Sequence, residues 1–348
     1  MRLFGRRNEP APDPAGGIAE FWAWWAQARP ELDAMAAAGE TGRLAEWIGP
    51  AVRVVHPSLV WEIVPGPVAE RALVVTSAGD PELRPTAHRW AAAAQPADGS
   101  WEFHPSRRAV PDATGLVLDV GGYEFALDGL VLGLRVPHGS PRIDVVAHHP
   151  VFTLLDEETR TEAALLALDR LLGEDEVARW VGDVSAAAYE PIDAVPAVHL
   201  PGVVADLASG YRDEQWALLE GRTASGARLV ATARHPLRPV DHPLLDQHIE
   251  ITLPYAHRDA EGLPAGSSLE TLRDVEERLA GWIGRLSGRA VLAAHLSAEG
   301  QRVLHVYADP LSEAAVRARE LVEGWEEGRP RVDVTADPGW IAVSPFLT

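Results

Sequence analysis

Apolar residues recur at helical spacing near the start of the chain. Between residues 18 and 28 they occupy positions 18, 21, 22 and 25, which places them on one face and predicts a helix with Trp24 off that face. Pro30 follows, and because proline suits a first helical turn, we expect a second helix to begin there. The opening section is therefore predicted to be helical.

A further helix is predicted over residues 41–55. Leu44, Trp47 and Ile48 repeat at a spacing of three to four residues and are expected to face inward. Pro50 lies inside this segment and predicts a kink or a break, because it lacks a backbone N–H.

From residue 59 onward, strand-like and helical segments alternate in groups. In the first half we predict strands over 59–64 and 72–76, a helix over 81–94, a strand over 101–103, a hairpin around 121–122, helices over 156–172 and 173–180, and a strand towards 189. In the second half we predict strands over 215–222, 228–234 and 248–254, a helix over 268–285, strands over 289–297 and 302–308, a helix over 312–324 and a strand over 331–336.

This order predicts the α+β class, with two domains that are each a mainly antiparallel or mixed sheet carrying helices on one face. A proline-punctuated stretch near residues 191–212 is the expected boundary. We therefore expect a flexible tail over 1–16, an N-terminal domain over 17–195, a linker with a short helix over 196–212 and a C-terminal domain over 213–348.

The composition removes whole classes of chemistry. The chain has neither lysine nor cysteine among its 348 residues, so a P-loop lysine, a Schiff base, a thiol nucleophile and a cysteine-ligated metal are all absent. The formal net charge of -20 repels nucleic acid and anionic lipid, and it favours a basic partner or a metal cation. Histidine, carboxylate and arginine chemistry stays open.

The sequence also bears on location. Arginines occur close to the N-terminus, but prolines and acidic residues follow where a signal peptide needs an apolar stretch. No apolar run reaches the roughly 18 residues of a membrane span. We therefore expect a cytoplasmic protein with no membrane partner.

Histidines and carboxylates cluster in the second half and include the candidate metal ligands His242, Asp246, His248 and Glu250. Such side chains suit zinc, manganese or iron, and His248 and Glu250 lie two apart, on one face of a predicted strand. A solvated face or an ion pair explains that pattern equally well. The spacing matches no established metal motif, so we expect no cofactor.

Two aspartates complete the set of candidate ligands. Asp309 ends a strand on which Tyr307 and His305 share a face, and it is either an acid–base group or the turn into the next helix. Asp337 begins an Asp-Pro-Gly turn before Trp340, which either lines a pocket or closes the core. Tyr307, Trp340 and Trp24 are the candidate residues of a binding surface.

Residues 210–348 resemble the bacterial family called domain of unknown function 695. The resemblance rests on Trp216, the predicted hairpin over 291–309 with Tyr307 and Asp309, and the Asp337 and Trp340 ending. The family implies no reaction, cofactor or catalytic residue.

The first half resembles uncharacterised bacterial proteins that begin with a tryptophan-rich helix. The resemblance rests on the aromatic run over 21–25, on Trp101-Glu102-Phe103 and on Leu172-Gly173-Glu174. Members of the family in the second half are sometimes joined to a domain similar to a bacterial regulator that inhibits ribonuclease E, which slightly favours a regulatory role.

These observations favour a non-catalytic binding or regulatory protein over an enzyme. Its partner is expected to be another protein or a small ligand, and its oligomeric state is open. The alternative is a metal-dependent hydrolase that uses a subset of the six candidate ligands, with arginine available to hold an anionic substrate. Convergence of those six side chains in the fold discriminates between the two hypotheses.

Overall fold

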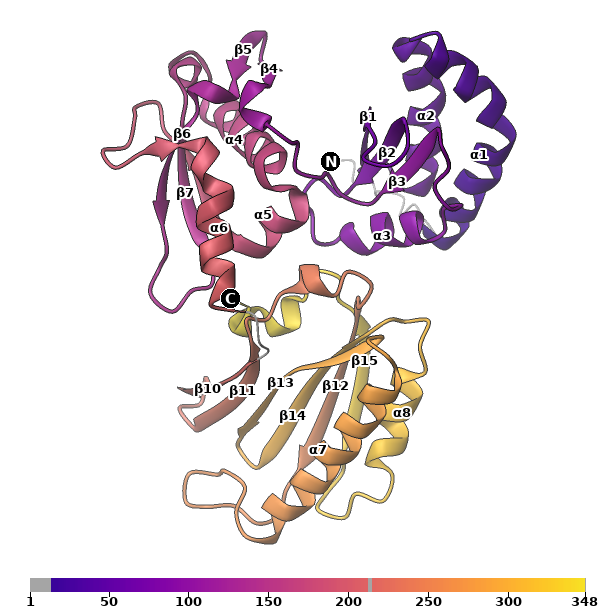
Figure 1. The fold of residues 1–348 in the computed structure, drawn as a ribbon. Coiled ribbons are helices and arrows are strands. Elements are labelled where there is room, and N and C mark those ends of the chain that lie inside the picture. Colours follow the sequence, from indigo (N-terminus) through magenta and orange to yellow (C-terminus); the bar gives the residue numbers. More distant parts are fainter. Residues whose placement is uncertain (1–13, 212–214, 348) are drawn as a thin grey trace, which may run out of the picture. The chain divides into compact units, whose positions relative to one another are not determined.

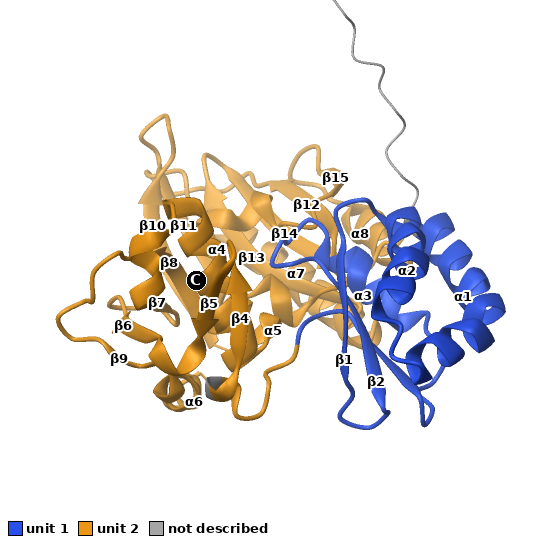
Figure 2. Ribbon diagram, turned by 90° about the horizontal axis from the view of Figure 1, so that it is seen from above, with its two compact units in different colours: residues 1–107 blue, residues 108–348 orange. Residues whose placement is uncertain are grey.

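The computed structural model describes residues 14–211 and 215–347, and the chain divides into two compact units, residues 1–107 and 108–348 (Figure 2). Most of the tail predicted over 1–16 lies outside the described residues. This division differs from the predicted boundary over 196–212, which falls inside the second unit. Within the described part, no helix combines the length and the apolar character that a membrane crossing needs.

The first unit packs three helices against a small sheet. Its elements are α1 (Pro14–Ala37), α2 (Thr41–Val55), β1 (Val60–Pro65), β2 (Arg71–Thr76), α3 (Arg84–Ala92) and β3 (Trp101–His104). The sheet has the order β1-β2-β3, with an antiparallel and a parallel pair. Its core joins apolar residues of all three helices to β2 and β3.

Two helical predictions in this unit need correction. The segment expected to be two helices is the single helix α1, which continues through Pro30. It continues because Leu32 and Met35, beyond the proline, are buried in the same core as Phe21 and Trp25, and this packing offsets the cost of the proline. In α2, Leu44 and Ile48 face inward as predicted, but Trp47 is 39% exposed.

The first part of the second unit contains two small sheets and three helices. Its strands are β4 (Val117–Val120), β5 (Tyr123–Ala126), β6 (Val131–Arg135), β7 (Ile143–His148), β8 (Val181–Ala186) and β9 (Val195–Pro196), and its helices are α4 (Glu157–Leu172), α5 (Glu174–Trp180) and α6 (Leu200–Ser209). The strands form the predicted hairpin β4-β5 and a sheet of order β8-β7-β6-β9. The short helix α6, predicted as part of a linker, buries Leu200 and Val204 in the core of this region.

The second part of the unit is a six-stranded sheet with two helices. It consists of β10 (Gln215–Arg222), β11 (Arg228–His235), β12 (Gln247–Pro254), α7 (Ser267–Arg285), β13 (Ala290–Ala298), β14 (Gln301–Ala308), α8 (Ala314–Val322) and β15 (Arg331–Ala336). The strand order is β10-β11-β13-β14-β12-β15, and every neighbouring pair is antiparallel. The α+β prediction is confirmed, and each element of this region lies within two residues of its predicted bounds.

The two faces of this sheet carry different cores. Ile249, Ile251, Leu304 and Val306 pack under α7 and α8. On the opposite face, the chain's final segment covers Tyr307 and Val291. This arrangement follows from alternation, because neighbouring residues of a strand point to opposite faces.

Candidate functional site

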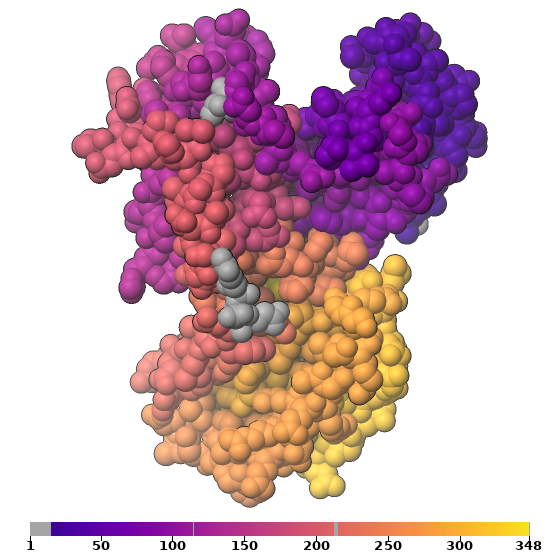
Figure 3. Space-filling view, viewed as in Figure 1, coloured from indigo at the N-terminus to yellow at the C-terminus, as the bar shows by residue number. Residues whose placement is uncertain are grey.

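The sheet of the second unit is only partly covered by its helices. Helices α7 and α8 lie over β13, β14, β12 and β15 and leave β10 and β11 uncovered (Figure 1). We call β10 and β11, together with the adjoining face of β13, the open half of the sheet. The salmon-coloured segment that carries β10 and β11 lies at the surface in the space-filling view (Figure 3).

Strand β10 is an edge strand with large apolar side chains in solvent. It lies at one end of the sheet, and within the described ranges it pairs with β11 alone. Trp216 is 46% exposed, Leu218 is 67% exposed and Leu219 is 39% exposed. Because Trp216 and Leu218 share one face and Leu219 lies on the other, both faces of this edge are apolar. Proteins normally protect such an edge, since its unpaired backbone groups can pair with another chain.

A polar cluster lies where the open half meets α7. The Arg302 guanidinium donates through Nη1 to Glu276 and to Nδ1 of His295, the latter at 2.5 Å. Its Nε donates to Oγ of Ser297 at 2.7 Å. Glu276 comes from α7, His295 and Ser297 from β13 and Arg302 from β14, so three elements contribute to the cluster.

Burial controls the protonation of this cluster. Burial, assisted by the nearby charge of Arg302, lowers the pKa of His295 to about 4. Burial also raises the pKa of Glu276, although Arg302 opposes that change, and it lowers the pKa of Arg302. His295 is therefore neutral at physiological pH. Because its Nδ1 accepts from Arg302, we assign the ring proton to Nε2.

Trp216 borders the same cluster. Its ring lies 6.4 Å from that of His295, and the guanidinium of Arg234 lies 5.4 Å from the Trp216 ring centre. Arg234 also donates from Nε to the carbonyl of Leu292 at 2.9 Å. A partly exposed indole ring, a cation and a neutral imidazole thus lie together on the open half of the sheet, and such groups can bind an incoming side chain.

Several candidate residues from the sequence lie instead in a buried polar chain on the opposite face. Nε2 of His248 and Nδ1 of His305 are 3.0 Å apart, and Tyr307 donates its hydroxyl to Asp337 at 2.5 Å. Trp340 stacks on Tyr307 with ring centres 3.8 Å apart. Burial lowers the pKa of His248, and burial together with Asp337 raises the pKa of Tyr307.

The binding surface predicted at Tyr307 and Trp340 is wrong. Tyr307 is 0% exposed and Trp340 is 1% exposed, because the turn that Asp337 begins folds Trp340 back onto the sheet. Asp337 holds this turn by accepting from the backbone N–H groups of Ile341 and Ala342. Trp340 therefore closes a core, which was the alternative interpretation. Trp24, in the first unit, is half-buried against Phe21 and Trp25.

The six candidate metal ligands do not form one group among the described residues. Asp309 pairs with Arg289 at 3.2 Å and accepts from the N–H of Leu311, as expected for a turn into α8. The His242 ring stacks on Trp340, and the carbonyl of Asp246 accepts from the N–H of Asp337.

Glu250, the remaining candidate on β12, is half-buried and accepts weakly from Thr252, at 3.5 Å. Among the residues that the structure describes, no three histidine, aspartate, glutamate or cysteine side chains are grouped so that they could hold a metal ion. The convergence that the hydrolase alternative requires is therefore not observed in this part of the chain.

The sequence contained weak signals for the open half of the sheet. Trp216 lies at the start of a predicted strand, and Glu276 lies within the helix predicted over 268–285. A run with apolar residues at consecutive positions, Trp216 to Leu219, is typical of a strand with two apolar faces. Its exposure depends on the strand order, which the run does not determine.

Comparison with known proteins identifies only part of the chain. No curated protein matches it, and no solved structure matches it. Strand β10 and the first six residues of β11 lie before residue 234, where the matching region begins. Residues 234–348 match the model described as a family of unknown function (DUF695), which confirms the predicted resemblance for the C-terminal part of this protein.

Proposed function

We propose that the second unit is a non-catalytic binding module that takes an extended segment of a partner polypeptide along the free edge of β10. The exposure of Trp216, Leu218 and Leu219 on an edge strand carries this proposal. An added strand gains affinity from main-chain hydrogen bonds and selectivity from alternate side chains. A tryptophan at such a contact commonly provides a large share of the binding energy.

Charge favours a different protein over a second copy of this chain. Each copy carries a formal net charge of -20, so self-association at this edge would bring two strongly acidic molecules together. A neutral or basic segment avoids this repulsion and is attracted to the acidic surface. We therefore propose an apolar, neutral or basic extended segment as the partner, and a cytoplasmic, regulatory setting.

The contacts of the polar cluster support binding rather than catalysis. Arg302 is engaged by Glu276, His295 and Ser297, so its role in the cluster is to fix His295 in one orientation. No serine or threonine hydroxyl is hydrogen-bonded to His295 in the described residues, and a nucleophile with an adjacent base would require such a contact.

The test selects ligands from a phage-displayed library of random dodecapeptides on the full chain. We expect peptides with alternating apolar residues to bind, and Leu218→Lys to weaken their binding at least tenfold. The matched control is Leu311→Lys, because Leu311 is 78% exposed and lies outside the sheet. Hydrogen exchange at the amides of β10 should slow when a selected peptide binds.

Two results would overturn the proposal. The first is a selection that yields no binder, or yields binders that Leu218→Lys and Leu311→Lys affect equally. The second is a dimer in sedimentation equilibrium that Leu218→Lys dissociates, because a second copy would then be the occupant of the edge.

A further inference from the structure

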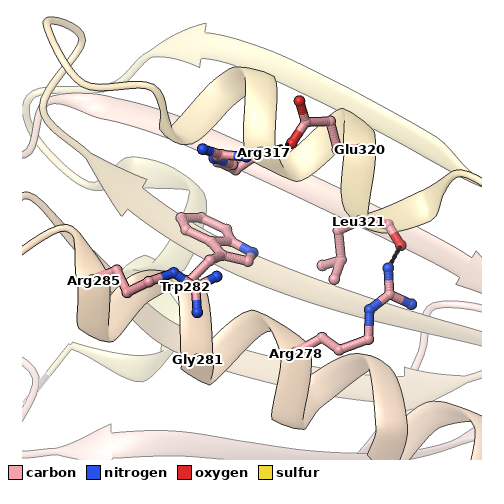
Figure 4. Close-up of a pocket in the computed structure, with 7 residues that line it drawn as sticks. All are labelled: Arg278, Gly281, Trp282, Arg285, Arg317, Glu320 and Leu321. Carbon is pink, nitrogen blue, oxygen red and sulfur yellow. Dashed lines mark hydrogen bonds and ion pairs between the residues drawn. The ribbon is translucent and has the colours of Figure 1, made fainter.

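A groove lined by arginines lies between α7 and α8, away from β10. Its volume is about 280 Å³, and Arg278, Arg285 and Arg317 line it together with Trp282 and Gly281 (Figure 4). This volume is close to the lower end of the range for small-molecule sites, roughly 300 to 1,000 Å³. The groove can therefore hold a compact ligand.

The local charge of the groove is opposite to that of the whole chain. Three arginines and one glutamate line it, whereas the protein carries a formal net charge of -20. The three guanidinium groups come from two helices, so packing of α7 against α8 brings them together. A concentration of positive charge in an acidic protein indicates an anion as the ligand.

The three arginines differ in how fully they are engaged. Arg317 pairs with Glu313 at 3.1 Å and with Glu320 at 3.0 Å. Arg278 donates from Nη2 to the carbonyl of Leu321 at 3.2 Å. Arg285 has no hydrogen bond or ion pair with any residue in the described ranges, so its full donor set is available to a ligand.

Gly281 leaves the backbone of α7 without a side chain where it lines this groove. It lies inside α7, where glycine is less favourable than alanine. A Cβ at this position would meet only Nη1 of Arg285, at 3.8 Å, which is ordinary contact distance. Packing of the protein itself therefore does not require glycine here, and the missing side chain leaves room for a ligand beside the helix backbone.

We propose that the α7–α8 groove binds a small phosphate-class oxyanion, with Arg285 as its principal contact and Gly281 leaving room above the helix. Guanidinium groups bind phosphate through pairs of parallel hydrogen bonds, and a dianion with several acceptor oxygens can use more than one arginine. The formal net charge of -20 disfavours nucleic acids and anionic membranes, so the ligand is a small molecule.

The experiment titrates the full chain with inorganic phosphate at constant ionic strength and follows binding by calorimetry and Tm. We expect saturable binding that Arg285→Gln weakens at least tenfold. The matched control is Arg273→Gln, which removes an arginine of α7 that does not line the groove. Gly281→Ala should raise Tm without phosphate and weaken phosphate binding, a combination that a purely structural role would not produce.

Acetate and chloride are titrated in parallel as the other anions. Equal responses to phosphate and chloride would overturn the proposal, as would equal losses in Arg285→Gln and Arg273→Gln. Tighter binding of acetate would replace the phosphate-class ligand with a carboxylate. None of these results depends on β10, so the outcome is separate from the test of peptide binding.

Discussion

Acidification to pH 5 should destabilise the second unit through two histidines, the buried His305 and the half-buried His295. His305 is 6% exposed beside His248, and His295 lies beside Arg302. Burial lowers the pKa of both to about 4, with Arg302 assisting at His295 and His248 assisting at His305. An unfolded histidine has a pKa of about 6.5, so in the window between these values the unfolded chain binds protons that the folded chain does not.

The magnitude follows from proton linkage. The contribution of these two histidines to the free energy of unfolding is fully present above the unfolded pKa of about 6.5. It falls as the pH drops from about 6.5 towards about 4, and it changes no further below about pH 4. Between pH 7 and pH 5 each histidine contributes a loss on the order of 2 kcal/mol in the free energy of unfolding. The loss should be smaller for His295, because its side chain is 21% exposed.

The assay is guanidinium denaturation at pH 7, 6 and 5, followed by circular dichroism. We compare the wild type with His305→Asn and His295→Asn, because asparagine replaces the hydrogen-bonding Nδ1 with a group that does not titrate. Each variant should lose a large part of its share of the pH dependence. The control is His138→Asn, which changes an exposed histidine. The prediction is wrong if His305→Asn and His295→Asn keep the wild-type pH dependence, as the control His138→Asn should.

Two further predictions concern single side chains. Trp340→Ala should lower the free energy of unfolding by about 3–5 kcal/mol, because it removes a buried ring stacked on Tyr307. Trp216→Ala, at an exposed position, should lower it far less in the same denaturation assay. Equal losses in the two variants would contradict the assigned burial. Pro30→Ala should stabilise the first unit by about 1–3 kcal/mol, because it restores a backbone donor inside α1. The thermal unfolding midpoint should therefore rise, and a fall in the midpoint would show that the proline is required.

For the polar chain that contains Tyr307, the sequence predicts the strand faces but not which face is buried. Alternation along β14 placed His305 and Tyr307 on one face and Leu304 and Val306 on the other, as observed. The same pattern could not distinguish an exposed face from one covered by a later segment. Trp340, 33 residues further along the chain, covers Tyr307, and only the folded chain brings the two together.

The candidate ligands show the same limit. Sequence proximity groups His242, Asp246, His248 and Glu250, yet in the described part of the chain no three of these side chains are placed to hold a metal ion. No sequence pattern predicts the polar cluster of Glu276, His295 and Arg302, because its members lie on three elements, separated by 19 and 7 residues in the chain. Charged residues this far apart carry no joint pattern that spacing could reveal.

The amino-acid sequence was sufficient to predict the elements of the second unit's large sheet and the residues on each face of its strands, and the absence of lysine and cysteine removes their chemistry. These properties depend on local periodicity and on composition, which need no distant contacts. The folded chain was needed to show that β10 is an edge, that Tyr307 and Trp340 are buried and that three arginines share one groove. Strand order and helix packing depend on contacts between distant segments, and those contacts decide which apolar and charged residues remain in solvent.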